Sequence, residues 1–203
     1  MTTFYISTKL NRRGDFSHVL DFEVKALLEV DDEARSKAAA TLEGFVLRRT
    51  YDLDHLSFDD FDSRSGHTYD GYNILTKHQQ EICSALKIKQ DDLELVGDII
   101  FCENLVVDPE YRKNKLALRL LREPIWAFGN LSSLMILKAH PTGEGMEDDD
   151  CRKLADYYRS DKSLKFEELD RKNLAGWLVS KGAWDEYKSD DEYYYDGIIS
   201  DED

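Results

Sequence analysis

The sequence is poor in the residues that build metal centres and disulfide frameworks. It has 203 residues but only 3 cysteines and 5 histidines. Cys83, Cys102 and Cys151 are widely spaced and match no zinc or redox pattern, and no two histidines stand at ligand spacing. We therefore expect no metal site, and we interpret Cys102, which lies in an apolar run, as a small buried residue rather than a nucleophile.

Long apolar runs are also missing. No stretch approaches the about 18 apolar residues that a membrane span needs, and the first residues lack the pattern of a secretory signal. These absences predict a cytoplasmic protein without membrane contact. A length of 203 residues with 41% hydrophobic residues suits one globular domain, residues 1–203, with a sizeable core.

Positive charge is scarce as well. The chain has 27 Lys and Arg residues against 42 Asp and Glu residues, a formal net charge of -15. A nucleic-acid surface requires clustered Lys and Arg, so we expect no direct nucleic-acid binding. Such a charge permits a cationic partner, either an amine-bearing small molecule or a basic protein, although acidic residues also serve solubility alone.

The most informative part of the chain is residues 99–121. The apolar residues at 99–101 and 105–107 are typical of a central strand that is buried on both faces. Pro109 ends this strand, because proline has no amide hydrogen to donate. A polar turn that carries Arg112 then leads into a second periodic segment.

The segment after this turn predicts an amphipathic helix. From Leu116 the apolar positions recur at helical spacing, and Pro124 disfavours helical geometry at Glu123, which predicts a short helix. The first amides of a helix lack partners, and its dipole favours negative charge there. A strand that enters a helix through a basic turn therefore predicts a site for a phosphorylated cofactor.

Residues 103–117 resemble the GNAT superfamily of acyl-CoA-dependent N-acetyltransferases. The family's strand ending, E-x-L-x-V-x-P-x-x-R, matches ENLVVDPEYR at residues 103–112. Its next turn, Arg/Gln-x-x-Gly-x-Gly/Ala, corresponds to RKNKLA at residues 112–117, where Lys115 replaces the middle glycine. A lysine in a left-handed conformation costs about 1 kcal/mol, but its charge can pair with phosphate. Replacement of this glycine by Lys115 is therefore compatible both with weakened and with retained binding of the cofactor.

This resemblance implies a mixed, mainly antiparallel α/β sheet with a splayed central strand and helices on both faces. It also implies acetyl-CoA as acyl donor, with a pantetheine arm that pairs with the backbone of Leu105, Val106 and Val107. The diphosphate would be held by the turn residues Arg112, Lys113, Asn114, Lys115, Leu116 and Ala117. The run that begins at residues 61–65 resembles a little-characterised bacterial or phage-like branch of the superfamily.

Acetyl transfer to an amine requires a neutral amine, a polarised thioester and a proton for the departing thiolate. Glu103 is the best candidate base, because a carboxylate on a central strand near a cleft is partly removed from water. His140, at the end of the next predicted strand, is a second candidate. The proton donor stays open among Tyr157, Tyr158, Tyr187, Tyr193 and Tyr194.

A second resemblance lies at residues 173–184, which look like the family's last helix and turn. Gly182 is a typical helix-ending residue. Leu178 stands where the family has a tyrosine that often protonates the thiolate, so the general acid must lie elsewhere.

The remaining patterns complete the predicted fold. Strands are expected at residues 18–30, 40–49, 133–141 and 193–199, and a helix at residues 68–86. Residues 31–37 form a polar connection, and residues 91–96 lead into the central strand. Residues 142–170 form an insertion with a helix-like part at 151–160, and residues 200–203 form a frayed acidic tail.

The chain is thus predicted to transfer the acetyl group of acetyl-CoA to a primary amine by direct attack in a ternary complex. An alternative belongs to a different class: a catalytically inactive GNAT-fold protein whose acidic surface binds a basic protein or mimics nucleic acid. Lys115, Leu178 and the acidic C-terminus motivate this alternative. A homodimer stays open.

Overall fold

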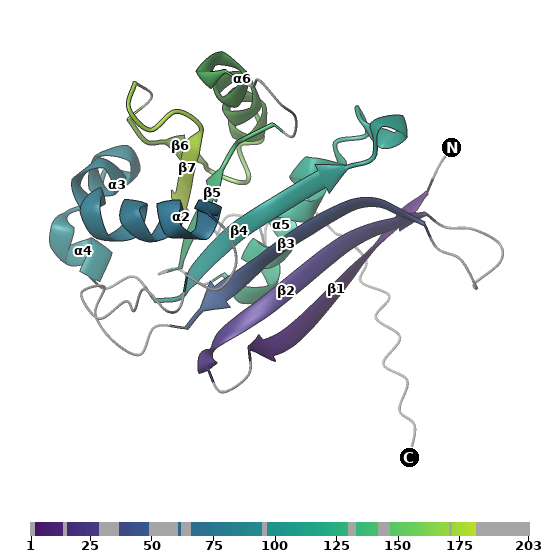
Figure 1. Ribbon diagram of the computed structural model, residues 1–203, viewed down its shortest axis with the longest axis horizontal. Helices are drawn as coiled ribbons and strands as arrows, with labels where there is room; N and C mark the ends of the chain where they lie inside the picture. Colours follow the sequence, from purple (N-terminus) through teal and green to yellow (C-terminus); the bar gives the residue numbers. More distant parts are fainter. Residues whose placement is uncertain are drawn as a thin grey trace.

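A 7-stranded sheet is the framework of the protein, in the order β1-β2-β3-β4-β5-β7-β6 (Figure 1). The computed structural model describes residues 3–13, 16–28, 37–48, 61, 66–94, 97–129, 133–141, 147–170 and 172–181. Its strands are β1 (Phe4–Arg13), β2 (Phe16–Leu28), β3 (Ala38–Leu47), β4 (Ile99–Val107), β5 (Leu134–Lys138), β6 (Glu167–Glu168) and β7 (Trp177–Lys181). Its helices are α2 (Gly66–Lys77), α3 (Gln79–Leu86), α4 (Gln90–Glu94), η3 (Pro109–Tyr111), α5 (Leu116–Phe128) and α6 (Asp148–Arg159). The predicted mixed, mainly antiparallel sheet with helices on both faces is confirmed.

Strands β1, β2 and β3 form an antiparallel meander at one side of the sheet. Buried and partly exposed residues alternate along β2, where Phe22, Val24 and Ala26 are buried. Alternation of this kind directs one set of side chains into the core and the other set to the opposite face. The strands predicted at residues 18–30 and 40–49 are therefore confirmed, whereas β1 was not predicted.

Strand β4 lies in the middle of the sheet and pairs with β5 over only part of its length. The two strands are parallel, and their pairing ends at Cys102 and Leu137. Beyond that point β4 continues to Val107, still paired with β3. The predicted splay of the central strand is thus confirmed, and it opens the sheet on one side of the second half of β4.

Helix α5 covers one face of the sheet. Its residues Leu116, Leu120 and Leu121 are at most 1% exposed and belong to a core cluster with Phe22 of β2 and Leu42 of β3. Each buried leucine side chain contributes roughly 1.5 to 3 kcal/mol relative to an exposed one. Helix α6 adds Ala155 and Tyr158 to the same cluster, so α5 and α6 lie on the same side of the sheet.

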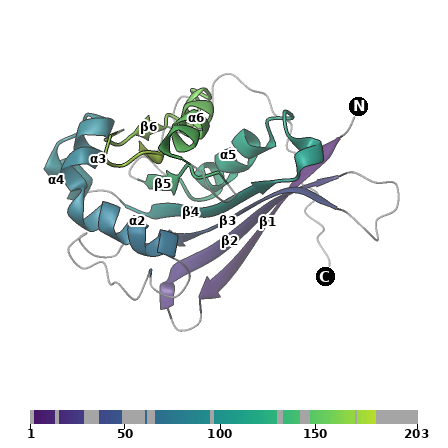
Figure 2. The same ribbon diagram turned by 45° about the horizontal axis from the view of Figure 1, so that its top comes forward.

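Helices α2 and α3 cover the opposite face, near the beginning of β4 (Figure 2). Ile74 and Leu75 of α2 and Ile82 of α3 form a second core cluster with Ile99 and Phe101 of β4. Glycine at position 71 allows this approach, because a Cβ atom there would lie 2.2 Å from the Phe101 ring. These helices leave the second half of β4 uncovered on this face.

Two predicted helix boundaries were wrong. Helix α5 does not stop before Pro124 but continues through it to Phe128. A proline inside a helix costs about 3 kcal/mol, and burial of Leu120 and Leu121 before it and core contacts of Ile125 after it offset that cost. The helix predicted at residues 68–86 is divided between α2 and α3 at His78, whose φ of -121° is not helical.

The predicted last helix was also wrong. Residues 177–181 of the segment 173–184 form β7, between β5 and β6, and Leu178 is fully buried. Side chains from both faces of this strand enter the core, which explains why its apolar spacing is ambiguous between helix and strand. The strand predicted at residues 193–199 and the tail at residues 200–203 lie outside the described residues.

Candidate active site

An irregularity in β4 marks the place where the sheet opens. Cys102 is opposite Gly44 of β3 and Asn104 is opposite Glu43, so Glu103 is an extra residue that forms a β-bulge. A glycine is needed at position 44, because a Cβ atom would lie 2.2 Å from the carbonyl oxygen of Phe101. The bulge therefore places Glu103 next to the point where β5 stops pairing with β4.

A cleft with a volume of about 1030 Å³ opens at this bulge. On the face covered by α5 its wall includes Cys102, Leu105, Leu121 and Tyr158. Cys102 is 6% exposed, and burial raises the pKa of its thiol, so it packs as an apolar residue and is not poised to be a nucleophile.

The opposite face of the sheet supplies the other wall of the cleft. Glu23 and Glu43 alternate with core residues of the α5 face along β2 and β3, so they belong to this second face. The Asn104 side-chain amide donates a hydrogen bond to Glu43 at 3.3 Å, which places Asn104 beside it. Residues of both faces therefore line this one cleft at the splay.

The second half of β4 presents backbone polar groups to this opening. The Asp108 amide donates to the carbonyl of Ala39 in β3, and hydrogen-bonded pairs alternate along antiparallel strands. Val106 consequently pairs with β3, while the amides and carbonyls of Leu105 and Val107 are directed away from β3. On that side β5 no longer pairs with β4, because this pairing ends at Leu137.

The turn after β4 has the left-handed backbone that the sequence predicts for a glycine position. Lys115, the N-cap of α5, has a φ of 56°, and Lys113 has a φ of 74°. No side chain caps the helix at Lys115, so the first amides of α5 are not taken by a capping group. Lys115 therefore has the left-handed conformation expected of a glycine and also carries a positive charge.

A small polar cluster holds this turn against the sheet. The Asp108 carboxylate accepts from the Glu110 amide at 3.0 Å and forms an ion pair with Lys37 at 2.9 Å. Lys37 hydrogen bonds to it, which lowers the pKa of Asp108. The Lys37 ammonium also lies 5.6 Å from the centre of the Tyr111 ring. Together these contacts fix the backbone immediately before Arg112.

The predicted site residues occupy three different environments. Glu103 and Leu105 line the cleft, whereas Val106 is 44% exposed on the open face. The side chains of Arg112, Lys113, Asn114 and Lys115 are exposed in the turn, and none of them lines the cleft. The Asn114 side chain bonds back to the Tyr111 carbonyl, while Leu116, Ala117 and Val107 contribute side chains to the core cluster or its edge.

Of the five candidate tyrosines, Tyr158 is the one in the described residues that lines the cleft. It is 6% exposed, and burial strongly raises the pKa of its hydroxyl. Its neighbour Tyr157 is 38% exposed, and Tyr187, Tyr193 and Tyr194 lie outside the described residues. Helical spacing from Cys151 and Ala155, both buried, was the signal in the sequence that separates Tyr158 from Tyr157.

The acidic wall of the cleft was not predicted. Glu23 of β2 and Glu43 of β3 are directly opposite each other, and Lys25 forms an ion pair with Glu23 at 2.7 Å. Like charges in such a pair destabilise a sheet by up to about 1 kcal/mol. Asp21 lies two residues from Glu23 and also lines the cleft. Strand alternation in the sequence predicts the face on which each residue lies. It does not predict which residues are opposite each other on neighbouring strands, which the structure shows.

His140 lies beyond the end of β5 and is exposed at the rim of the cleft. With Lys138 and Trp177 it also borders a smaller cavity of about 200 Å³. The Lys138 ammonium lies 5.7 Å from the centre of the Trp177 ring and 3.8 Å from the Asp70 carboxylate.

The described residues contain no group of three or more His, Cys, Asp or Glu side chains that could hold a metal ion. Among the same residues, no helix is long and apolar enough to cross a membrane.

Comparison with known proteins gives little to identify this chain. No family model and no curated protein matches it. Among solved structures it is similar to arylalkylamine N-acetyltransferase 2 from Aedes aegypti, with 18% sequence identity and a TM-score of 0.34. The similarity covers 59% of this chain and 51% of that chain, so it spans about half of the mosquito enzyme. At this level it assigns neither a family nor an activity.

Proposed function

We propose that the protein is an N-acetyltransferase that uses acetyl-CoA to acetylate a cationic primary amine. The observation that carries this proposal is the cleft at the splay of β4, which residues of both faces of the sheet line. A cleft lined in this way suits a reaction in which two substrates approach from opposite faces of the sheet. The resemblance of residues 103–117 to the GNAT superfamily supports the same reaction.

The donor side of the proposed site is the face covered by α5, and its groups suit a CoA molecule. The exposed cations Arg112, Lys113 and Lys115 stand beside the uncapped amides of α5, a combination that favours a diphosphate. The backbone groups of Leu105 and Val107 that are directed away from β3 form an edge to which a pantetheine amide chain can add like a strand. We assign these residues to cofactor binding.

The acceptor side is the open face, where carboxylates gather. Glu23 and Glu43 form a like-charge pair at the cleft, and a substrate ammonium group between them would offset their repulsion. Asp21 extends the same wall. We therefore propose that the acceptor carries a positive charge in addition to the amine that reacts, as polyamines and lysine-rich peptides do.

Two residues at the bulge are assigned to proton transfer. Bound acetyl-CoA supplies an activated thioester carbonyl carbon and a thiolate leaving group. Glu103 removes a proton from the acceptor ammonium, directly or through water, and the free amine forms the new C–N bond as the C–S bond breaks. The second proton of the attacking nitrogen passes to water, which leaves a neutral amide. Tyr158 donates its hydroxyl proton to the departing sulfur, a role that suits a tyrosine whose raised pKa keeps it protonated at neutral pH.

Thermal denaturation in the presence of acetyl-CoA tests the donor site. Binding to the folded state alone adds about 2.7 kcal/mol at a ligand concentration of 100 times Kd, which raises Tm by roughly 5 to 10 °C in a chain of this size. The double variant Arg112→Glu, Lys115→Glu should lose this shift. Lys87→Glu is a matched control, because Lys87 is also an exposed lysine in a left-handed turn, with a φ of 54°.

A panel of mono-, di- and polyamines with detection of released CoA then tests turnover. We expect diamines and polyamines to react faster than monoamines of the same length. Glu103→Gln and Tyr158→Phe should each reduce kcat by at least about tenfold while the Kd of acetyl-CoA stays unchanged. Binding without turnover for every amine would favour the catalytically inactive alternative, and no binding would refute the donor site.

A further inference from the structure

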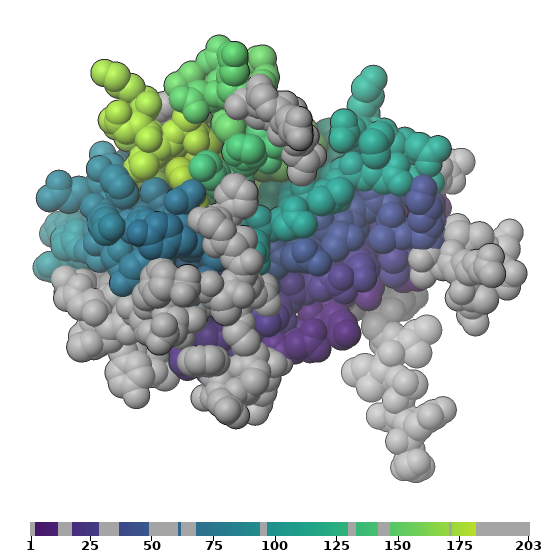
Figure 3. All heavy atoms as spheres, viewed as in Figure 1, coloured from purple at the N-terminus to yellow at the C-terminus, as the bar shows by residue number. Residues whose placement is uncertain are grey.

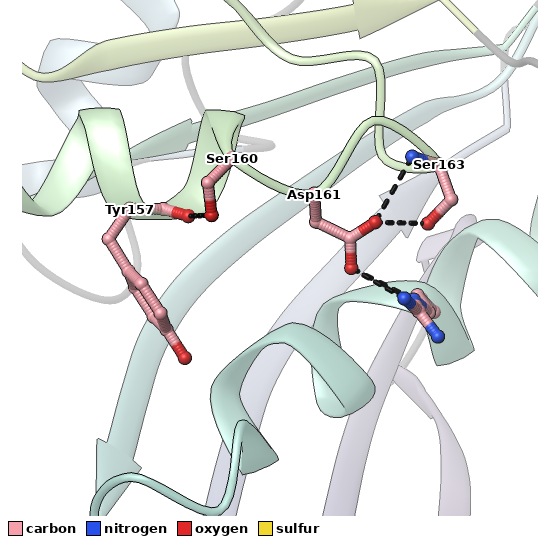
Figure 4. A network of polar contacts seen from close by, with 5 residues as sticks. Tyr157, Ser160, Asp161 and Ser163 are labelled. Carbon is pink, nitrogen blue, oxygen red and sulfur yellow. Dashed lines mark hydrogen bonds and ion pairs between the residues drawn. The ribbon is translucent and has the colours of Figure 1, made fainter.

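The loop after α6 contains a polar network. It links the end of α6 to α5, the two helices that line the covered side of the cleft. Two nitrogens of the Arg122 guanidinium in α5 donate to one oxygen of Asp161, Nε at 3.1 Å and Nη2 at 2.6 Å. The other Asp161 oxygen accepts from the Ser163 amide at 3.0 Å and from the Ser163 hydroxyl at 2.6 Å (Figure 4). The carboxylate is therefore fully satisfied, with four hydrogen bonds.

The burial of this pair distinguishes it from the surface ion pairs of the protein. The Asp161 side chain is 9% exposed and that of Arg122 is 39% exposed. Burial alone would raise the pKa of Asp161, but hydrogen bonds from Ser163 and Arg122 outweigh it and lower the pKa. Surface pairs contribute little because water competes for both charges, whereas here one partner is withdrawn from water.

The network is also bonded to the end of α6 that carries Tyr158. The Asp161 amide donates to the Tyr158 carbonyl at 3.3 Å, and the Ser160 hydroxyl donates to the Tyr157 carbonyl at 2.6 Å. These bonds satisfy carbonyls of the last turn of α6. These bonds therefore hold the backbone of Tyr158 at a fixed position relative to Asp161.

On its other side the network adjoins α5 at the cleft. Arg122 directly follows Leu121, which is fully buried and lines the cleft together with Tyr158 of α6. The same loop is tied to β7, because the buried Ser180 hydroxyl donates to the Leu164 carbonyl at 2.6 Å. The loop thus has one fixed partner in α5 and another in the sheet.

We infer that Arg122 and Asp161 are positioning residues that hold Tyr158 at the cleft, at a set separation from α5. The inference rests on the proposed function, in which Tyr158 donates a proton and α5 begins at the diphosphate turn. A loss of the pair lets the C-terminal end of α6 move away from α5 and exposes Tyr158 to water. Neither residue touches a substrate; each acts through the placement of Tyr158.

The test reads the surroundings of Tyr158 directly, without an acceptor. Protein labelled with 3-fluorotyrosine, whose hydroxyl is more acidic than that of tyrosine, is titrated by 19F NMR, and Tyr158→Phe identifies the signal. Burial and the neighbouring Cys102 of β4 and Tyr157 of α6 raise the pKa of Tyr158. In Asp161→Asn and Arg122→Gln we expect its midpoint to fall by about one pH unit as solvation increases. In Arg122→Lys, which retains a charged donor, the midpoint should fall by less.

Asp150→Asn is the matched control, because it breaks an exposed ion pair with Lys153 in the same helix, at 3.1 Å. Its Tyr158 midpoint should equal that of the unmodified chain. An unchanged midpoint in both Asp161→Asn and Arg122→Gln, in proteins that remain folded by circular dichroism, would overturn the inference.

Acetyl-CoA binding separates this inference from the proposed function. We expect Asp161→Asn to bind acetyl-CoA with unchanged Kd, and to reduce kcat about tenfold on any amine that reacts. A wild-type protein that binds no acetyl-CoA would refute the proposed function, while the 19F titration would still decide whether the pair positions Tyr158.

Discussion

Among the described residues, helices cover one face of the sheet at the cleft, whereas on the other face, here called the open face, side chains of the strands themselves are exposed. On the covered face, Leu121 of α5 and Tyr158 of α6 are buried over Cys102. On the open face, strands β2, β3 and β4 are visible beside α2 and α3 (Figure 3), and Glu43 and Asn104 are exposed. The covered face is fixed by apolar contacts, whereas the open face offers charges that can be changed without disturbing the core. Substitutions on the two faces should therefore have different consequences.

The largest expected difference is between two neighbouring residues of β3. Gly44→Ala places a methyl group 2.2 Å from a backbone carbonyl and 2.6 Å from the Phe22 ring. We expect it to reduce the free energy of unfolding by about 3 kcal/mol, as overpacking against backbone does. Glu43→Ala, on the open face, should change it by no more than about 0.5 kcal/mol. Equal losses in urea denaturation would contradict the difference between the faces.

The second prediction concerns the pH dependence of the covered face. The pKa of Asp161 is lowered in the folded state, so its contribution is present above the unfolded pKa of about 3.9 and is lost as pH falls through the folded value. Asp161→Asn should reduce the free energy of unfolding by about 2 kcal/mol at pH 7, since it weakens hydrogen bonds to a charged group. Urea denaturation of both proteins at pH 7 and pH 3 should show this difference shrinking at the lower pH, and a constant difference would contradict it.

The third prediction is that the carboxylates of the open face contribute to binding of the acceptor rather than to the stability of the fold. The double variant Glu23→Gln, Glu43→Gln removes a like-charge pair and also the exposed ion pair between Lys25 and Glu23, so its free energy of unfolding should change by no more than about 0.5 kcal/mol. The KM for a cationic acceptor should rise about tenfold, which corresponds to about 1.4 kcal/mol, with the Kd of acetyl-CoA unchanged. Steady-state assays at low salt measure this KM. An equal rise in KM for a neutral amine would show that these carboxylates do not bind the charge of the acceptor.

The two faces also differ in how far their sequence predicted them. Much of the covered wall, with the strand, the turn and α5, comes from residues 99–121, where an apolar strand, Pro109 and helical spacing follow one another along the chain. Local patterns of this kind report local structure. The splay was expected only from a resemblance, and the structure added that Glu103 is the extra residue of a bulge.

The open face could not be predicted in the same way. Glu23 and Glu43 are separated by a connection, and only the register of β2 with β3 places them opposite each other. Register depends on long-range pairing rather than on any short segment. The same limit explains Arg122 and Asp161, which meet only after α5 and α6 pack on one side of the sheet. The helix boundary at Pro124 failed for a related reason, because core packing outweighed a local preference.

The smallest expected effect is at Lys115, where the covered face meets solvent. Lys115→Gly relieves a left-handed conformation that costs a lysine about 1 kcal/mol, although the greater freedom of unfolded glycine offsets part of the gain. We expect the free energy of unfolding to rise by about 0.5 kcal/mol. Lys87→Gly should give the same gain, because Lys87 has a φ of 54° at the C-cap of α3.

The two lysine variants should differ in binding alone. The backbone at Lys115 already adopts the conformation that glycine would supply, so the glycine variant loses a charge and gains no closer approach to phosphate. Calorimetric titration with acetyl-CoA should therefore show an affinity about threefold lower for Lys115→Gly, or about 0.7 kcal/mol, and unchanged for Lys87→Gly. A tighter complex for Lys115→Gly would mean that the lysine side chain obstructs the diphosphate, and that the turn binds through its amides alone.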